Sequence, residues 1–155
     1  MSQSFYILCG MPGAGKSTFC KNNLPNCKVV SRDIIRFELG YTSSVDEKCV
    51  GTKHEEQHVT IRENELIKEY LEAGYDIVLD NMNGGQYLKP TVEYIKSIAP
   101  KAKIIGYNIV TPLEKCIERR KDQISEEVMR NIYSRFHYIE KNNTLFDDVR
   151  DFSGI

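Results

Sequence analysis

The amino-acid sequence predicts an α/β fold in which a parallel β-sheet is covered by helices on both faces. Short segments rich in apolar, β-branched and aromatic residues alternate along the chain with longer segments of helical periodicity. Strands of this kind are buried on both faces and are joined by right-handed crossovers. In addition, the glycine-rich segment GMPGAGKST, residues 10–18, separates the first predicted strand from the first predicted helix. We therefore expect a ligand site at the carboxyl ends of the strands.

The predicted elements follow one another without a linker or an internal repeat. Strands are expected over residues 5–9, 28–31, 76–80 and 103–109, with helices between them near residues 15–23, 33–39, 52–73 and 86–99. Gly74 is a suitable C-cap for the third helix, and Pro100 ends the fourth. The tail has a helical pattern throughout, with helices over residues 113–121 and 125–140. Ser125 is a favourable N-cap for the last of them because two glutamates follow it.

Length and composition favour one domain over residues 1–155. The chain has 41% hydrophobic and 28% charged residues, and it contains no apolar run near the ~20 residues that a membrane helix needs. The N-terminal residues lack the basic region of a signal peptide. The five cysteines are scattered, with no C-x-x-C pair, which indicates reduced thiols and a cytoplasmic protein. A net charge of −1 argues against extended non-specific binding to duplexes but leaves room for a short nucleic-acid end in a local cleft.

Residues 10–18 fit the pattern G-x-x-x-x-G-K-[ST], which binds the phosphates of a nucleoside triphosphate and is typical of P-loop NTPases. Its glycines let the backbone point N–H groups inward, and the following helix N-terminus adds partial positive charge. Lys16 is expected to reach the β- and γ-phosphates, and the Ser17 hydroxyl to bind Mg²⁺. We predict ATP and Mg²⁺ as cofactors. The nucleotide-binding residues are Gly10, Met11, Pro12, Gly13, Ala14, Gly15, Lys16, Ser17 and Thr18.

A second pattern, H-E-x-x-H, spans residues 54–58 and places two histidines on one helical face. In zinc proteases this arrangement binds the metal. Here the segment is highly charged and no third ligand lies nearby in the sequence. We expect no zinc and interpret the segment as a solvated helix face, or as part of a helix that binds the acceptor or packs against a lid.

Other sequence features distinguish whether the terminal phosphate is transferred to water, as in GTPase switches and motor ATPases, or to another acceptor, as in kinases. No N-K-x-D motif is present to read guanine as in GTPase switches, and motor ATPases need a longer chain. Two carboxylates instead follow predicted strands. Asp33 is placed to act as the base on an acceptor hydroxyl, or alternatively as the N-cap of its helix. Asp80 is placed to hold Mg²⁺ through water, or alternatively to form a turn.

A basic cluster lies between the two C-terminal helices, within a segment, residues 111–126, that we interpret as a helical lid. Arg119, Arg120 and Lys121 form this cluster. A closing lid brings an arginine to the charge that accumulates on the transferring phosphoryl group. The alternative is a solvated basic face. Together with the two carboxylates, the cluster predicts a kinase-type P-loop protein whose acceptor is not water.

The order of these segments resembles the polynucleotide 5′-hydroxyl kinases of bacteriophages, and more broadly the zeta-toxin-like P-loop kinases. The resemblance spans residues 5–140, and its phosphate loop is shared by many families. The more specific segments are SRDIIR (31–36), DNMN (80–83), TPLEKCIER (111–119) and VMRNIY (128–133).

This resemblance implies a transfer of the γ-phosphate of ATP to the 5′-hydroxyl of a short or single-stranded polynucleotide. Carried over by position, the resemblance implies that Lys16 contacts phosphate, Ser17 contacts Mg²⁺ and Asp33 is the base. Arg36 would hold a neighbouring phosphate of the acceptor, and Asp80 and Asn81 would line the acceptor channel. Arg119 would be the lid arginine.

The chain departs from the family at two points. The family has a second lid arginine one helical turn after the first, where this chain has Gln123, so Arg120 or Lys121 must substitute or the role is missing. The D-x-D-x-T motif of the associated phosphatase domain is also absent, so we expect no 3′-phosphatase activity. Kinases of a hydroxymethylated pyrimidine in DNA, of nucleotides and of small molecules remain as alternatives.

Overall fold

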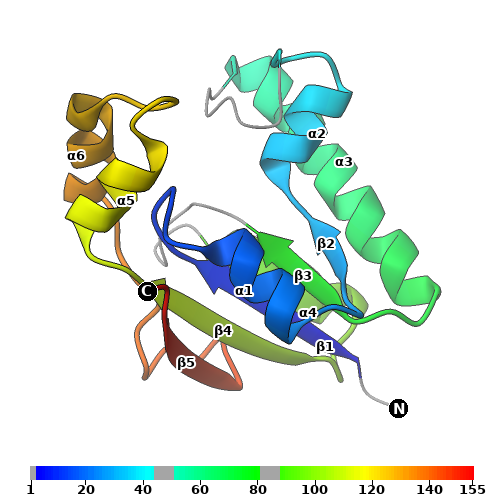
Figure 1. Ribbon diagram of the computed structural model, residues 1–155. Helices are drawn as coiled ribbons and strands as arrows, with labels where there is room; N and C mark the ends of the chain where they lie inside the picture. Colours follow the sequence, from blue (N-terminus) through cyan, green and yellow to red (C-terminus); the bar gives the residue numbers. More distant parts are fainter. Residues whose placement is uncertain (1–2, 44–50, 81–87) are drawn as a thin grey trace.

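The computed structural model describes residues 3–43, 51–80 and 88–155, and it confirms the predicted α/β fold (Figure 1). Five parallel strands form one sheet in the order β2-β3-β1-β4-β5. The strands are β1 (Ser4–Cys9), β2 (Lys28–Val30), β3 (Ile77–Asp80), β4 (Lys103–Val110) and β5 (Asp148–Ser153). The first four lie within one residue of the ranges expected from the sequence.

The helices also follow the predicted order. They are α1 (Lys16–Asn23), α2 (Arg32–Glu38), α3 (Lys53–Glu72), α4 (Lys89–Ile98), α5 (Leu113–Arg120) and α6 (Glu126–Ser134). Side-chain caps fix several starts: the Ser31 hydroxyl accepts from the Ile34 N–H at α2, and Thr52 and Glu55 form a capping box at α3. The predicted start of the fourth helix, residue 86, lies outside the described residues.

Side chains alternate between the two faces of the sheet along each strand, and they form one core cluster on each face. On β1, Phe5, Ile7 and Cys9 pack into a cluster with buried side chains of α3 and α4. Leu8 points to the opposite face and packs with side chains of α1, α5 and α6. Helices therefore cover both faces, as predicted, because a parallel sheet has no solvated face.

The prediction for the C-terminal tail was partly wrong. The last helix was expected to reach residue 140 but ends at Ser134, and β5 was not predicted. The chain leaves the helix because Ile139 is bonded to β4: Asn108 Oδ1 accepts from the Ile139 N–H, and Asn108 Nδ2 donates to the Ile139 carbonyl. These buried bonds return the chain to the sheet, where β5 pairs with β4.

The absence of a clear sequence signal for β5 has a structural cause. It is an edge strand, and Val149 is its only buried residue. Its other positions carry charged or exposed side chains, so neither a continuous apolar run nor strict alternation is present. Within the described residues, no helix is long and apolar enough to span a membrane.

Candidate active site

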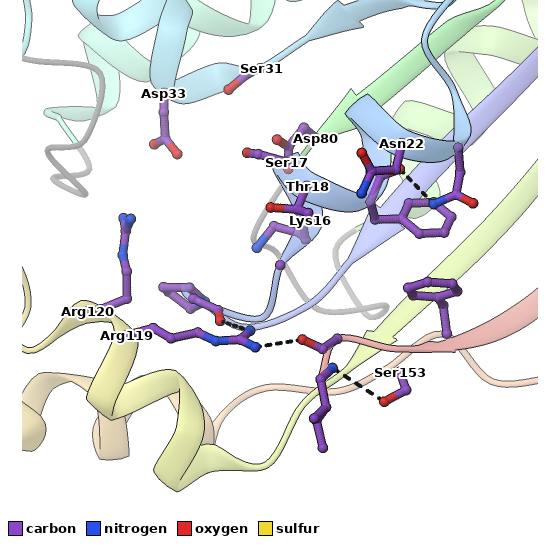
Figure 2. A pocket seen from close by; sticks show the side chains of 18 of the residues that line it. Lys16, Ser17, Thr18, Asn22, Ser31, Asp33, Asp80, Arg119, Arg120 and Ser153 are labelled. Atoms are coloured by element: carbon purple, nitrogen blue, oxygen red, sulfur yellow. Dashed lines mark hydrogen bonds between the residues drawn. The ribbon is translucent and has the colours of Figure 1, made fainter.

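A cavity of about 730 Å³ lies at the carboxyl ends of the strands, where the sequence predicted the ligand site (Figure 2). The phosphate loop and α1 form its floor. The start of α2 lies on one side and α5 on the other, and the last residues of the chain close a third side. The cavity contains Lys16, Ser17, Asp33, Asp80 and Arg119, which were predicted from separate parts of the sequence.

The phosphate loop has the backbone that its glycines allow. Gly13 and Gly15 have φ angles of 81° and 102°, which other residues rarely adopt. Lys16 Nζ donates to the carbonyls of Gly10 at 2.8 Å and Met11 at 3.1 Å, so its ammonium group lies against the loop. Met11 and Ala14 are buried and anchor the loop to the core. Pro12, Gly13 and residues 15–18 line the cavity.

Ser17 and Asp80 supply oxygen atoms at the same end of the cavity (Figure 2). A hydroxyl and a carboxylate, completed by phosphate oxygens and water, form the ligand set that Mg²⁺ prefers. The donor chemistry therefore fits the predicted metal. Asn81, predicted to line the acceptor channel, lies outside the described residues.

Asp33 also lines the cavity, and its orientation depends on a charge network between α2 and α3, which we call the Glu56 network (Arg32, Asp33, Arg36, Glu56 and Glu63). Arg36 Nη1 donates to Asp33 Oδ1 at 2.9 Å. The same guanidinium forms two bonds to Glu56, Nε to Oε2 at 2.9 Å and Nη2 to Oε1 at 2.7 Å. Arg32 adds ion pairs to Glu56 at 3.2 Å and to Glu63 at 3.5 Å.

These bonds hold the Glu56 carboxylate ionised. The pKa of Glu56 falls to about 2, first because of the hydrogen bonds from Arg36 and then because of those from Arg32, against the opposing effect of burial. Arg36 itself is only 8% exposed and, in the described part of the chain, is not among the residues that line the cavity. Its predicted contact with an acceptor phosphate stays a prediction. Glu56 was not predicted as a site residue, because its pairing with Arg36 on another helix leaves no signal in the H-E-x-x-H pattern.

The two histidines of that pattern lie at the exposed end of α3. Their rings are 4.4 Å apart, and His58 Nδ1 is 2.7 Å from the Tyr41 hydroxyl. Among the described residues, no group of three or more histidine, cysteine, aspartate or glutamate side chains is arranged to hold a metal ion.

The basic residues at the end of α5 differ in their contacts. Arg119 donates to two backbone carbonyls, Nη1 to Gly13 at 3.0 Å and Nη2 to Gly154 at 2.8 Å. Arg120 extends into the cavity (Figure 2). Lys121 pairs with Glu118 at 2.9 Å on the exposed surface.

The C-terminal residues form a part of the site that the sequence did not indicate. Phe152, Ser153, Gly154 and Ile155 line the cavity, as do Asn22 and Asn23 of α1. Gly154 lies so close to the loop that a Cβ atom there would overlap the Ala14 carbonyl and the Thr111 hydroxyl. Because β5 was not predicted, no sequence signal placed this segment beside the phosphate loop.

This fold and this site define a P-loop kinase domain: a parallel sheet, a phosphate loop between β1 and α1, and carboxylates at the ends of β2 and β3. Residues 5–128 match the model of the AAA_33 family, described as an AAA domain, and the chain belongs to that family. The likeness to P-loop kinases predicted from the sequence is confirmed.

Comparison with curated proteins and solved structures gives further relatives. L-seryl-tRNA(Sec) kinase of Methanococcus maripaludis is 28% identical over 135 residues, which are 84% of this chain and 51% of that protein. The present chain thus spans about half of that relative. Similar folds occur in a chain of the Pnkp1/Rnl/Hen1 RNA repair complex (TM-score 0.75, 19% identity, 94% of this chain and 47% of that one) and in a putative kinase from Chloroflexus aurantiacus (TM-score 0.72, 14% identity, 99% and 89%).

Proposed function

We propose that the protein is an ATP-dependent phosphotransferase that moves the γ-phosphate to the 5′-hydroxyl of a polynucleotide. The observation that carries the proposal is that one cavity contains the phosphate loop and, on the side wall at the start of α2, the carboxylate of Asp33. A base on that side suits an in-line transfer to an alcohol, because the acceptor oxygen must approach opposite the leaving group.

The chain's residues divide the reaction among them. The backbone N–H groups of the loop and the Lys16 ammonium bind the β- and γ-phosphates, while Ser17 directly and Asp80 through water would hold Mg²⁺. Bound Mg²⁺ supplies positive charge to the phosphate oxygens. Asp33 accepts the proton of the acceptor hydroxyl while the oxygen of that hydroxyl bonds to the γ-phosphorus. The bond between the γ-phosphorus and the β–γ bridging oxygen breaks, and ADP is released. An arginine of α5 stabilises the charge that accumulates on the transferring group.

Two observations support a nucleic-acid acceptor. The chain's fold is similar to that of a chain in an RNA repair complex that contains Pnkp1, and residues 31–36 resemble the acceptor motif of the polynucleotide kinases. In this motif Arg36 uses three of its five N–H groups for Glu56 and Asp33. The remaining two bond to no other described residue, but Arg36 is only 8% exposed, so a contact with a phosphate flanking the hydroxyl requires acceptor binding to open access to the guanidinium.

A second candidate acceptor is the hydroxyl of a seryl group attached to tRNA. The 28% identity to an L-seryl-tRNA(Sec) kinase favours it, since it covers most of this chain. Both candidates require the same donor site and the same base, and they differ in what surrounds the acceptor hydroxyl.

A panel of acceptors with γ-labelled ATP tests the proposal. It contains 5′-hydroxyl oligonucleotides of DNA and RNA, seryl-tRNA, hydroxymethylated DNA, free nucleosides and sugars. We expect label on the 5′ end of an oligonucleotide, and loss of that labelling in Asp33→Asn. Efficient labelling of seryl-tRNA alone would select the second candidate, and labelling of only a nucleoside or sugar would refute both.

A further inference from the structure

We propose that Arg120 is the arginine that contacts the transferring phosphoryl group and that Arg119 instead fixes the phosphate loop to the C-terminal segment. The inference rests on the proposed phosphotransferase function and assigns a catalytic residue within it. The two neighbouring arginines point in different directions from the end of α5 (Figure 2).

The contacts of Arg119 are those of a structural tie. Its two terminal nitrogens donate to the carbonyls of Gly13 in the loop and Gly154 in the tail, at 3.0 and 2.8 Å. Gly154 N–H in turn donates to the Val110 carbonyl at 2.9 Å, and Thr111 Oγ1 donates to the Ala14 carbonyl at 2.7 Å. The phosphate loop, the end of β4 and the C-terminal residues are therefore linked by short hydrogen bonds. The Arg119 guanidinium takes part in two of them.

Arg120 has the opposite properties. Its Nε atom is buried, and no hydrogen bond or ion pair joins the side chain to another described residue. A charged donor buried without an acceptor is costly, so the site is incomplete until an anion supplies oxygen atoms. The guanidinium extends into the cavity that contains Lys16 and Asp33, and a planar fork of donors fits phosphate oxygens.

The surroundings hold Arg120 in this position. Its backbone carbonyl accepts from the N–H groups of Gln123 and Ile124, both at 2.9 Å, which fixes the end of α5. Its stem lies against Gly13, where a Cβ atom would be 2.8 Å from Arg120 Cγ. The loop glycine thus makes room for the arginine beside the loop that is expected to bind the triphosphate.

Calorimetric titration without an acceptor tests the assignment independently of the acceptor's identity. Mg²⁺ with a non-hydrolysable ATP analogue, and Mg²⁺ with ADP, are titrated into wild type, Arg120→Ala, Arg120→Lys and Arg119→Ala. Lys115→Ala is the matched control, since Lys115 is exposed on the same helix and forms no ion pair with another described residue. Melting temperatures establish that each variant is folded.

We expect Arg120→Ala to weaken the triphosphate tenfold or more and ADP less than about threefold, because only the triphosphate carries the γ-phosphate. Arg120→Lys should recover part of the loss. Arg119→Ala should weaken both nucleotides alike and lower the melting temperature, and the control should match wild type. Phosphoryl transfer to the best acceptor should fall about 10²–10³-fold in kcat for Arg120→Ala.

Equal binding of both nucleotides by Arg120→Ala and wild type, with kcat within threefold, would overturn the assignment. So would a selective loss of the triphosphate in Arg119→Ala. If Arg120→Ala discriminates as expected but no nucleic acid is phosphorylated, the assignment stands and the proposed acceptor is wrong.

Discussion

The Glu56 network offers a test of how the candidate base is held, through Glu56→Gln. The substitution keeps the shape of the side chain and removes its charge. One guanidinium, that of Arg36, bonds both oxygens of Glu56 and one oxygen of Asp33. Loss of the Glu56 charge should therefore loosen Arg36 and, with it, the orientation of Asp33.

The size of the effect follows from the pKa of Glu56. A pKa lowered from 4.5 to about 2 corresponds to at most about 3 kcal/mol of folding free energy. The side chain remains 21% exposed, and solvent screens part of this energy, so we expect a loss of about 1–3 kcal/mol at pH 7. Because the folded-state pKa is lowered, this contribution is complete above pH 4.5 and disappears as the pH falls towards 2, with about 40% left at pH 3.

Urea unfolding of wild type and variant at pH 7, 5, 4 and 3 measures the difference directly. We expect the two free energies of unfolding to converge as the pH falls below 4.5, and turnover at pH 7 to drop roughly 10- to 100-fold through misplacement of Asp33. Glu65→Gln is the matched control on the same helix, because Glu65 forms only an exposed ion pair with Arg62 among the described residues and should cost less than about 0.5 kcal/mol. A Glu56→Gln difference that is absent at pH 7, or that stays constant with pH, would refute this reasoning.

Three further outcomes are expected at the donor site. Mg-ATP at about 100 times its Kd should stabilise the protein by about 2.7 kcal/mol in a thermal melt, and Lys16→Ala should lose most of that shift. Asp33→Asn should lower turnover roughly 10²–10⁴-fold while calorimetry shows nearly unchanged ATP binding; an equal loss of both would make it a structural residue. Gly154→Ala should weaken nucleotide binding and lower the melting temperature, because its methyl group would overlap Ala14 and Thr111; a variant that melts and binds like wild type would contradict the close packing.

The parts of the fold and site that could be predicted have strong local signals. The strands β1, β3 and β4 are buried on both faces and appear in the sequence as apolar runs. The phosphate loop is recognisable because its glycines, lysine and hydroxyl have fixed spacing within one turn. Asp33 and Asp80 line the cavity, in agreement with the rule that ligands bind beyond strand ends, and their chemical roles stay predictions.

The remaining parts depend on contacts between residues far apart in the sequence. β5 is defined by its pairing with β4 and by the bonds of Asn108, not by its own composition. The same holds for Glu56, whose partner Arg36 lies twenty residues earlier on another helix. The side chains of Arg119 and Arg120 point in different directions because of the position of α5 against the phosphate loop. A run of consecutive basic residues in the sequence gives no information about that position.

The distribution of charge around the cavity connects these observations to the acceptor. On the side of α2 and α3, Arg32 and Arg36 are balanced by glutamates and by Asp33. On the side of α5, the described residues give Arg119 and Arg120 no acidic partner. Among the described residues, the arginines without an acidic partner thus lie beside the phosphate loop, while on the side of α2 two arginines face three carboxylates. With the proposed function, such an arrangement would concentrate electrostatic binding on the donor and leave the acceptor to be recognised by directed hydrogen bonds near one hydroxyl, which suits the proposed chain end better than an extended duplex.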